Sequence, residues 1–580
     1  MRRPRGPAVR AGALPFARAG AQALVPFLVL LLVPPAAAQQ PAPVPPLPGR
    51  DRPAAPAPQP APRGPRLALP PPEAGTPLPP IDPRPLFTLT AVRFTGNTAL
   101  TTTELEAVAA PFLGRPAGSE TLEALRQAVT RAYLARGYVN SGAVLPDQEV
   151  AGGVVALHVV EGRLDEIAVT GTRRLPQDYV RDRVARAAGT PFDVNALQSG
   201  FQLLLQDPLV ARLDGRLSPG PEPGTARLDL HVEEKGPVGI VAGIENSRSP
   251  ATGALLLSGG VTARNLLGLA ELLTVSAGRT EGGPDYGASA SLPLSPAGTR
   301  LTLSAERSSS AIVETALEEL DVRSTFRQAS IGVRHPLLRS ADRELGVGLS
   351  LSRRRNETFI FRDRPFSFAP GAVDGRSDVT VLRLAQDYVD RGQVRSLAAR
   401  ATVSVGLDAL GATVGGGGPD GRFTSLLLQG EYARSLGGEV TLVARADAQY
   451  AFDRLLTLEQ FGIGGIDSVR GYRQNRFVRD NGLLASAELR VPLSVLGLDE
   501  EQGALRRLVL VPFADYGRSW NRGSGDGTGV LASVGLGAVW AVAEMLEVQA
   551  FYGRALRRAD RPGDSLQDRG IHFRVRLTAF

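Results

Sequence analysis

The feature that most constrains the fold is a two-residue alternation that recurs from residue 237 to residue 580 of the 580-residue chain. From Ala399 to Asp408, apolar residues at every odd position alternate with polar residues, charged residues or glycine, and residues 442–450 and 571–579 repeat this alternation. A period of two places successive side chains on opposite faces of a strand. One face would be apolar, and the other carries charges that are costly in a packed core. We therefore expect residues 237–580 to form a membrane-spanning β-barrel with lipid outside and water inside.

A soluble β-sandwich is the alternative fold, because alternation alone does not say which face is buried. The segment is long and shows no second domain boundary, and strands of ten or more residues recur in it, the length that a tilted membrane strand requires. Dividing residues 237–580 at their turn residues gives sixteen expected strands, to within two. Single-chain bacterial barrels have even strand numbers. The length of the segment and the length of its strands therefore favour the barrel.

The N-terminus is typical of a secretory signal peptide. Five arginines precede an apolar run at residues 21–33, which is followed by two prolines and three alanines. The run is shorter than the roughly 20 residues of a spanning helix, so we expect cleavage between Ala38 and Gln39 rather than an uncleaved anchor.

Removal of the signal peptide changes the charge of the chain. The formal net charge is +7, and loss of five arginines with no acidic residue leaves 7 − 5 = +2. The remaining charge does not indicate nucleic-acid binding, and no nucleic-acid partner is expected.

Residues 39–85 hold 19 prolines in 47 residues. Such a segment cannot bury a core, so we expect an extended, semi-rigid linker. A proline-rich ligand for a recognition domain is the alternative.

Residues 86–236 carry the order strand-helix-helix-strand-strand twice. The expected strands lie at 86–94, 143–145, 154–160, 164–169, 210–217 and 227–233, and the expected helices at 102–110, 121–136, 176–188 and 193–206. The last helix presents an apolar face with helical spacing, which we assign to a core: Val194, Leu197, Phe201 and Leu204. The sequence therefore predicts two small mixed modules in tandem.

The sequence offers little for catalysis. It has no cysteine and only four histidines, at 158, 231, 335 and 572. No phosphate-binding loop or Ser-His-Asp arrangement is recognisable, and the Gly-Ile-Gly-Gly sequence at Gly462 lacks the strand-then-helix context of a phosphate loop. We expect no enzyme activity, no cofactor and no metal site, and we expect His158 and His572 in strands.

Three motifs carry a family resemblance over about residues 86–580. Residues 131–164, RAYLARGYVNSGAVLPDQEVAGGVVALHVVEGRL, combine a Y-x-x-x-G-Y helix end with an L-P-x-Q strand and a V-x-E-G ending. IDSVRGYRQNRF at 466–477 contains V-R-G-Y, and VPFADYGRSW at 511–520 contains F-x-D-x-G. Together they resemble the two-partner secretion transporters (the TpsB family, ShlB/FhaC type), relatives of BamA.

The resemblance implies a fold class and its boundaries. It implies two tandem POTRA domains of β-α-α-β-β order at 86–162 and 163–236, followed by a 16-stranded antiparallel barrel at 237–580. It also implies a bacterial outer-membrane location, with the POTRA domains in the periplasm.

The resemblance also gives the loop at 453–480 a place inside the barrel. It implies that Arg470 pairs with Asp515 on the inner wall, with Gly471 and Tyr472 beside it. Phe513 and Gly517 belong to the matching strand motif, F-x-D-x-G. Glycines let such a loop turn sharply, and an arginine binds a carboxylate in a bidentate geometry that lysine lacks. An exposed hairpin with a hydrated arginine is the alternative.

The implied function is export of an unfolded TpsA-type exoprotein, an adhesin or a haemolysin, that binds the POTRA domains and crosses the pore. The chain would contact outer-membrane lipid, and periplasmic chaperones and the barrel assembly machinery would serve its biogenesis, consistent with the terminal aromatic Phe580. A BamA-like insertase and a passive porin are the alternatives. The polar face predicts pore-lining residues: Arg400, Arg445, Asp447 and Arg574.

Overall fold

The computed structural model describes residues 66–68 and 86–579, apart from 315–318, 416–417, 497–506, 524–527, 544 and 558–562. The expected signal peptide with its cleavage site at Ala38 and Gln39 lies outside these residues, as do Phe580 and the linker apart from residues 66–68. Within the described part, no helix has the length and apolar character needed to cross a membrane.

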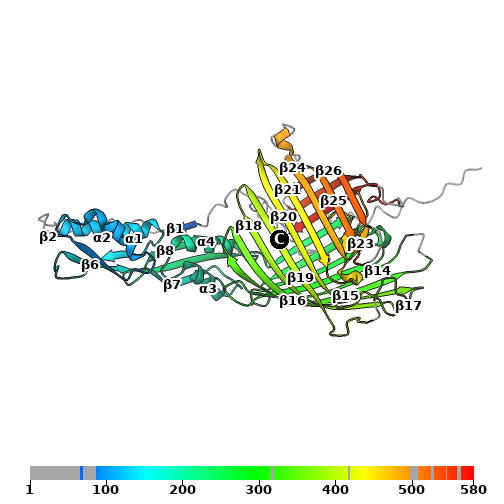
Figure 1. Cartoon of the computed structure of the whole chain (residues 1–580), viewed down its shortest axis with the longest axis horizontal. Helices are drawn as coiled ribbons and strands as arrows, with labels where there is room; N and C mark the ends of the chain where they lie inside the picture. Colours follow the sequence, from blue (N-terminus) through cyan, green and yellow to red (C-terminus); the bar gives the residue numbers. More distant parts are fainter. Residues whose placement is uncertain are drawn as a thin grey trace, which may run out of the picture. The chain divides into compact units, whose positions relative to one another are not determined.

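The first module packs two helices on a three-stranded sheet of order β3-β6-β5 (Figure 1). Its elements are β2 (Phe87–Thr88), β3 (Ala91–Thr95), α1 (Thr102–Ala109), η1 (Ala110–Phe112), β4 (Pro116–Ala117), α2 (Ser119–Ala135), β5 (Gly142–Val144) and β6 (Val154–Val160). Helix α1 begins at a capping box, because Thr101 and Glu104 bond each other's backbone N–H. Helix α2 buries Leu125, Val129 and Tyr133, which lie four residues apart and therefore on one face.

The strand expected at 86–94 is interrupted, which corrects the prediction. β2 pairs with β4, whereas β3 pairs in parallel with β6. Between them the chain changes partners: the N–H of Leu89 bonds the carbonyl of Arg115, and the N–H of Thr90 bonds that of Gly153. Leu89 is fully buried, so the break places an apolar side chain in the core that a straight strand would have directed elsewhere.

The second module has the same element order. It comprises β7 (Arg163–Thr170), α3 (Gln177–Ala188), α4 (Val194–Leu205), β8 (Val210–Pro219) and β9 (Thr225–Glu234). The predicted apolar face of α4, from Val194 to Leu204, lies in its core. Ala270, from the turn after the second barrel strand, belongs to the same core cluster, so this turn packs directly on the module.

A short strand of the proline-rich segment adds to this second sheet. β1 (Arg66–Ala68) pairs in parallel with residues 214–216 of β8, and the sheet order is β1-β8-β9-β7. The linker is therefore not a plain tether along its whole length.

Each module ties a turn to its sheet with one glutamate. Glu161 accepts hydrogen bonds from the N–H groups of Thr98 and Ala99 and from the hydroxyl of Tyr133. In the second module, Glu234 accepts three backbone N–H bonds from residues 173–175. Burial raises the pKa of Glu161, but the hydrogen bonds to its carboxylate outweigh burial and hold the pKa below its usual value.

The barrel is a closed antiparallel sheet. Its strands are β10 (Val238–Glu245), β11 (Leu256–Arg264), β12 (Leu272–Arg279), β13 (Pro284–Pro293), β14 (Arg300–Ala311), β15 (Arg323–Arg339), β16 (Arg343–Ile360), β17 (Arg364–Pro365), β18 (Arg376–Arg391), β19 (Arg395–Leu407), β20 (Thr424–Gly437), β21 (Val440–Ala451), β24 (Asn481–Pro492), β25 (Leu508–Trp520), β26 (Gly529–Ala543), β27 (Leu546–Ala555) and β28 (Ile571–Ala579). β17 has two residues and pairs only with β16, which itself pairs with β18. Among the described residues this leaves 17 − 1 = 16 spanning strands, so the predicted 16-stranded antiparallel barrel is confirmed. β10 and β28 close the barrel through six residue pairs.

The two faces of the barrel differ as the alternation predicts. Paired positions of four neighbouring strands form an exposed apolar row: Val333, Leu349, Leu384 and Val403. A contiguous exposed band of this kind is stable against lipid. On the opposite face, the same pairing aligns Asp387, Arg400, Gln429 and Asp447, and this polar row faces the lumen.

Replacing Glu161 tests the turn of the first module. We expect Glu161→Gln to weaken the bonds to Thr98 and Ala99 by about 1–3 kcal/mol, as expected for hydrogen bonds to a charged group. Amide exchange of residues 97–105 in the full-length protein should accelerate about 5- to 100-fold at pH 7, and Glu149→Gln, an exposed control, should not change it.

The effect should depend on pH in one direction. Because the folded pKa of Glu161 is depressed, its stabilisation is complete above the ordinary glutamate pKa of about 4.3 and is lost as the pH falls through the depressed value. The exchange difference between wild type and Glu161→Gln should therefore vanish in acid. Equal exchange at pH 7 would contradict the assignment.

Candidate functional site: the lumen loop and the inner wall

Residues 453–480, the lumen loop, are an insertion in the barrel wall. β21 pairs directly with β24, and the chain between them forms η3 (Thr457–Glu459) and a hairpin of β22 (Phe461–Ile463) with β23 (Phe477–Arg479). Ile463 and Val469 are fully buried, and Tyr472 is 4% exposed. An apolar cluster joins these residues to Leu484 and Leu531 of the wall, so the loop packs inside the barrel.

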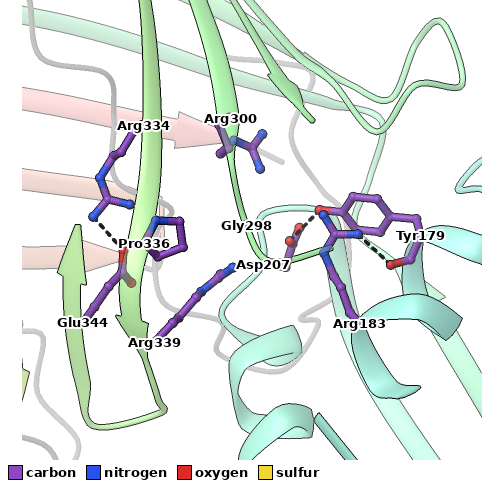
Figure 2. A pocket seen from close by; sticks show the side chains of 9 residues that line it. All are labelled: Tyr179, Arg183, Asp207, Gly298, Arg300, Arg334, Pro336, Arg339 and Glu344. Atoms are coloured by element: carbon purple, nitrogen blue, oxygen red, sulfur yellow. Dashed lines mark hydrogen bonds and ion pairs between the residues drawn. The ribbon is translucent and has the colours of Figure 1, made fainter. Parts of the chain in front are cut away.

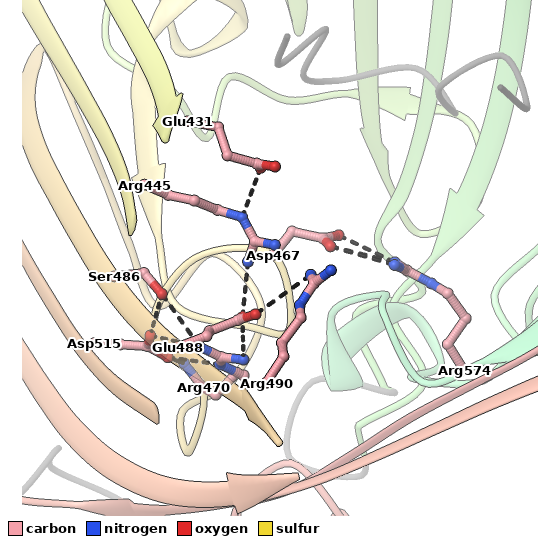
Figure 3. Close-up of polar contacts among 9 residues, drawn as sticks. All are labelled: Glu431, Arg445, Asp467, Arg470, Ser486, Glu488, Arg490, Asp515 and Arg574. Atoms are coloured by element: carbon pink, nitrogen blue, oxygen red, sulfur yellow. Dashed lines mark hydrogen bonds and ion pairs between the residues drawn. The ribbon is translucent and has the colours of Figure 1, made fainter. Parts of the chain in front are cut away.

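Arg470 binds Asp515 of β25 with three donors. Its Nε and Nη2 atoms lie 2.8 and 2.7 Å from the two carboxylate oxygens, and its backbone N–H bonds the same carboxylate at 3.0 Å. Figure 3 shows the two side chains facing each other. Arg470 is 3% and Asp515 is 4% exposed. The geometry is a bidentate, charge-assisted pair, which fixes orientation as well as distance.

A second carboxylate shares the guanidinium. Glu488 of β24 accepts from Nη1 of Arg470 at 2.7 Å and from Nη1 of Arg445 at 2.8 Å. Arg445 also binds Glu431 at 2.8 Å, so the charges alternate through a continuous network (Figure 3). A buried cation is costly unless it is paired, and here two strands supply acidic partners.

Aromatic rings complete the site. The Arg470 guanidinium carbon lies 3.6 Å from the centroid of the Phe513 ring, and Phe551 stands edge-on to Phe513 at 6.1 Å. The negative face of the Phe513 ring attracts the cation. Phe513 and Asp515 are two residues apart in β25 and therefore lie on the same face of the strand, which explains the spacing of F-x-D.

Gly471 lies where no side chain fits. Its φ is +89°, and a Cβ there would stand 2.7 Å from the carbonyl oxygen of Gly553 on β27. The N–H of Gly471 donates to Nε2 of His572 on β28 at 3.0 Å. Glycine therefore permits both the left-handed turn and the close approach.

Tyr472 and Gly517 fix the two sides of the loop tip. The Tyr472 hydroxyl lies 2.8 Å from the carbonyl oxygen of Ala532 and accepts the N–H of Arg557 at 3.2 Å. A Cβ at Gly517 would stand 2.8 Å from Cγ2 of Val469, so glycine in F-x-D-x-G leaves room for the loop.

Further ion pairs attach the loop to distant strands. Glu459 binds Arg354 of β16 and Arg383 of β18 at 2.8 and 2.7 Å. Asp467 pairs with Arg574 of β28 at 3.2 Å. In the sixteen-strand order, β16 and β28 are nine steps apart one way and seven the other. The loop therefore spans the lumen from one side to the nearly opposite one.

Arg473 ties the loop tip to two extracellular connections. It binds Asp568, between β27 and β28, at 2.9 Å, and Glu314, which follows β14, at 2.6 Å. Arg473 thus binds residues of the connections between strands, whereas Arg470 binds residues of the wall strands themselves.

The predicted residues thus fall into two groups. The structure brings together all six of the loop-and-wall residues, and Arg445 joins them through Glu488. Arg574 contacts the loop at Asp467 and also pairs with Glu245. Arg400 pairs with Asp387, while Asp447 is 2% exposed on the same inner face. That these four line a conducting path remains a prediction.

The sequence patterns did not indicate Glu488, Glu459 or the contact of His572 with the loop. Glu488 stands in a strand among apolar neighbours, A-E-L-R-V, and a charge on an inner face was the available signal. For Glu459 there was no local signal, because its arginine partners lie 105 and 76 residues away in sequence.

The sequence pattern of the haemolysin secretion/activation proteins ShlB/FhaC/HecB matches residues 224–539, more than half of the chain. The chain belongs to this family. The pattern of a ShlB-type POTRA domain also matches residues 87–162. Members of the ShlB/FhaC/HecB family are outer-membrane transporters of two-partner secretion, with POTRA domains in the periplasm.

Characterised relatives of this ShlB/FhaC/HecB member are transporters. The outer membrane transporter CdiB of Escherichia coli is 26% identical over 434 residues, which cover 69% of this chain and 68% of CdiB. The heme/hemopexin transporter protein HuxB of Haemophilus influenzae (strain 86-028NP) is 24% identical over 185 residues, 31% of this chain and 33% of HuxB.

Solved structures share the fold. CdiB from Escherichia coli superposes with a TM-score of 0.64 at 23% identity, covering 89% of this chain and 94% of CdiB. BamA from Haemophilus ducreyi lacking POTRA domains 1–3 gives a TM-score of 0.53 at 14% identity, covering 85% of this chain and 100% of that one. At these identities the likeness concerns the fold alone.

Arg470→Lys should destabilise the barrel although it keeps the charge. One ammonium cannot serve Asp515 and Glu488 in the same geometry, and a buried carboxylate left without its partner costs about 3 kcal/mol. Urea unfolding of the purified protein in detergent measures the change. Arg490→Lys, which alters only a 3.5 Å contact to the same Glu488, should have little effect, and equal stability of Arg470→Lys and wild type would contradict this role.

Gly471→Ala should displace the loop tip. The added methyl group meets the Gly553 carbonyl, and the left-handed backbone adds about 1–2 kcal/mol of strain. Gly437→Ala is a matched control, because its φ is +98° but no atom lies within 4 Å of its Cβ position. Amide exchange of residues 466–474 should accelerate in the first variant only. Similar behaviour of both variants would mean that the close approach is unimportant.

Proposed function

We propose that this transporter exports one large exoprotein of the TpsA type, which reaches the periplasm unfolded and carries an N-terminal secretion domain. The observation that carries the proposal is the polar attachment of the lumen loop inside a barrel of the secretion/activation family. Ion pairs such as Arg470–Asp515 and Glu459–Arg383 hold the loop across the lumen. A polypeptide in transit passes only if some of these ion pairs between loop and wall break and their charged groups bind water or the passing chain instead.

The first step is recognition at a POTRA edge. An extended segment of the exoprotein adds as a strand, so that main-chain hydrogen bonds supply affinity and side-chain pockets supply selectivity. In the second module, β1 covers only residues 214–216 of β8, a strand of ten residues, so among the described residues most of that edge has no strand partner.

The second step is passage through the lumen. Arg400, Arg445, Asp447 and Arg574 belong to the polar inner face, so the chain in transit meets charged groups rather than an apolar surface. Displacement of the loop exposes the partners of Arg470. Because water hydrates those charges as the loop leaves, the outer apolar belt need not change.

The alternatives fit the observations less well. A passive porin needs an open lumen, whereas here a loop crosses the barrel and is buried at its tip. An insertase of the BamA kind shares the fold at 14% identity, but the sequence pattern that covers more than half of the chain belongs to the secretion/activation proteins.

The test is export of a TpsA-type exoprotein that is co-expressed with this chain. Deleting the transporter should abolish its appearance in the culture medium, and wild-type complementation should restore it. Arg470→Ala and Asp515→Ala should each reduce export at equal barrel abundance, whereas Arg490→Ala should not. Wild-type export by both variants would show that the pair has no role in transport. Loss of unrelated outer-membrane barrels on deletion would instead favour the insertase.

A further inference from the structure

A cavity lies where the second module meets the periplasmic end of the barrel. Its volume is about 60 Å³, and it is lined by α3, the turn after α4, the β13–β14 turn, and the adjoining ends of β14, β15 and β16 (Figure 2). Four arginines and two carboxylates line it: Arg183, Arg300, Arg334, Arg339, Asp207 and Glu344. The formal balance is 4 − 2 = +2.

The carboxylates are already engaged. Glu344 binds Arg334 at 2.7 Å, and Arg334 also contacts Asp387 at 3.1 Å. Asp207 accepts the Tyr179 hydroxyl at 2.8 Å and the N–H of Leu209 at 3.0 Å. Glu344 is therefore paired with another arginine, and the hydrogen bonds of Asp207 go to neutral donors, although its charge still acts on Arg183.

Three arginines line the cavity and form no ion pair at contact distance among the described residues: Arg183, Arg300 and Arg339. Arg183 donates only to the carbonyls of Tyr179 and Ser295. Arg300 donates through Nε to Ser291, and its Nη2 is buried with no hydrogen-bond partner. Figure 2 shows the guanidinium groups of Arg183, Arg300 and Arg339 around one space, with Arg334 turned to Glu344.

The positions of these side chains are built into the fold. Arg183 stacks on the Tyr179 ring, with its guanidinium carbon 3.5 Å from the centroid. Arg339 lies over Gly298, where a Cβ would stand 2.5 Å from its Nη1 atom. Gly298 has a φ of +98°, so glycine serves both the turn and the approach of the arginine.

Like charges this close repel one another in a partly buried site. Burial is the largest influence on the pKa of Arg183 and lowers it; Tyr179 and Asp207 raise that pKa, and the positive charges of Arg339 and Arg300 lower it by smaller amounts. An anion between the three guanidinium groups removes this repulsion and satisfies the unpartnered Nη2 of Arg300.

We propose that this cavity binds a phosphate group, held by Arg183 of the second module and by Arg300 and Arg339 of the barrel. Arginines converging from three elements suit a tetrahedral oxyanion, whose oxygens accept from several directions, better than one planar carboxylate. The bound phosphate joins module and barrel, so it stiffens their junction. Free phosphate and a phospholipid headgroup of the periplasmic leaflet offer the same chemistry.

The experiment uses the full-length chain in lipid-free detergent, with inorganic phosphate titrated against chloride at constant ionic strength. Calorimetry should give one phosphate per chain. Arg339→Gln should weaken binding about tenfold or more, since one charge-assisted contact is worth at least about that factor. Gly298→Ala, which keeps every charge but displaces Arg339, should also weaken it.

A matched control and a lipid comparison complete the test. Arg343→Gln removes an exposed arginine of the same rim that does not line the cavity, and it should bind phosphate like wild type. After reconstitution with phosphatidylglycerol, native mass spectrometry should show one retained phospholipid, lost in Arg339→Gln, if the headgroup is the source. Retention of no lipid together with phosphate binding identifies free phosphate.

Two outcomes would overturn the proposal. One is the absence of saturable phosphate binding to wild type, or phosphate binding by Arg339→Gln and by Gly298→Ala that is as tight as that of wild type. The other is tighter binding of a ten-residue glutamate peptide that displaces phosphate, which would assign the cavity to acidic polypeptide segments. Neither result depends on export, so the proposal fails or stands separately from the proposed function.

Discussion

The ion pairing of the buried Arg470 guanidinium with two carboxylates is the interaction on which the rest of the barrel interior depends. A cation in this position is stable only if carboxylates meet it there, and Asp515 and Glu488 do so from adjacent strands. Their alignment requires the register of β24 with β25, where Ser486 faces Asp515. The position of the loop and the register of the wall are therefore set by the same contact.

The remaining loop contacts extend this constraint across the lumen. Glu459 reaches β16 and β18, and Gly471 reaches β28, so one segment connects nearly opposite parts of the wall. The contacts are mostly polar, and water can replace them one at a time. The outer apolar face has no such alternative, because it must stay against lipid. Conformational change is thus favoured in the lumen rather than in the wall.

Charge placement at the periplasmic end follows a different rule. In the loop network each arginine has an acidic partner, whereas Arg183, Arg300 and Arg339 share a cavity whose carboxylates are engaged elsewhere. The first arrangement is complete by itself, and the second is complete only with an added anion. The two sites therefore differ in whether carboxylates of the chain balance their arginine charges.

The sequence by itself determined the barrel and the tandem modules, because strand period and helix period are local patterns. The pairing of Arg470 with Asp515 was implied by the resemblance of two short motifs to the two-partner secretion transporters. It did not indicate that the strand at 86–94 breaks at Leu89, since a change of pairing partner depends on Arg115 and Gly153 elsewhere in the module. Glu488, Glu459 and the arginine cavity were decided only by tertiary structure. Each depends on the register of neighbouring strands or on contacts between distant segments, and neither quantity is encoded in local periodicity.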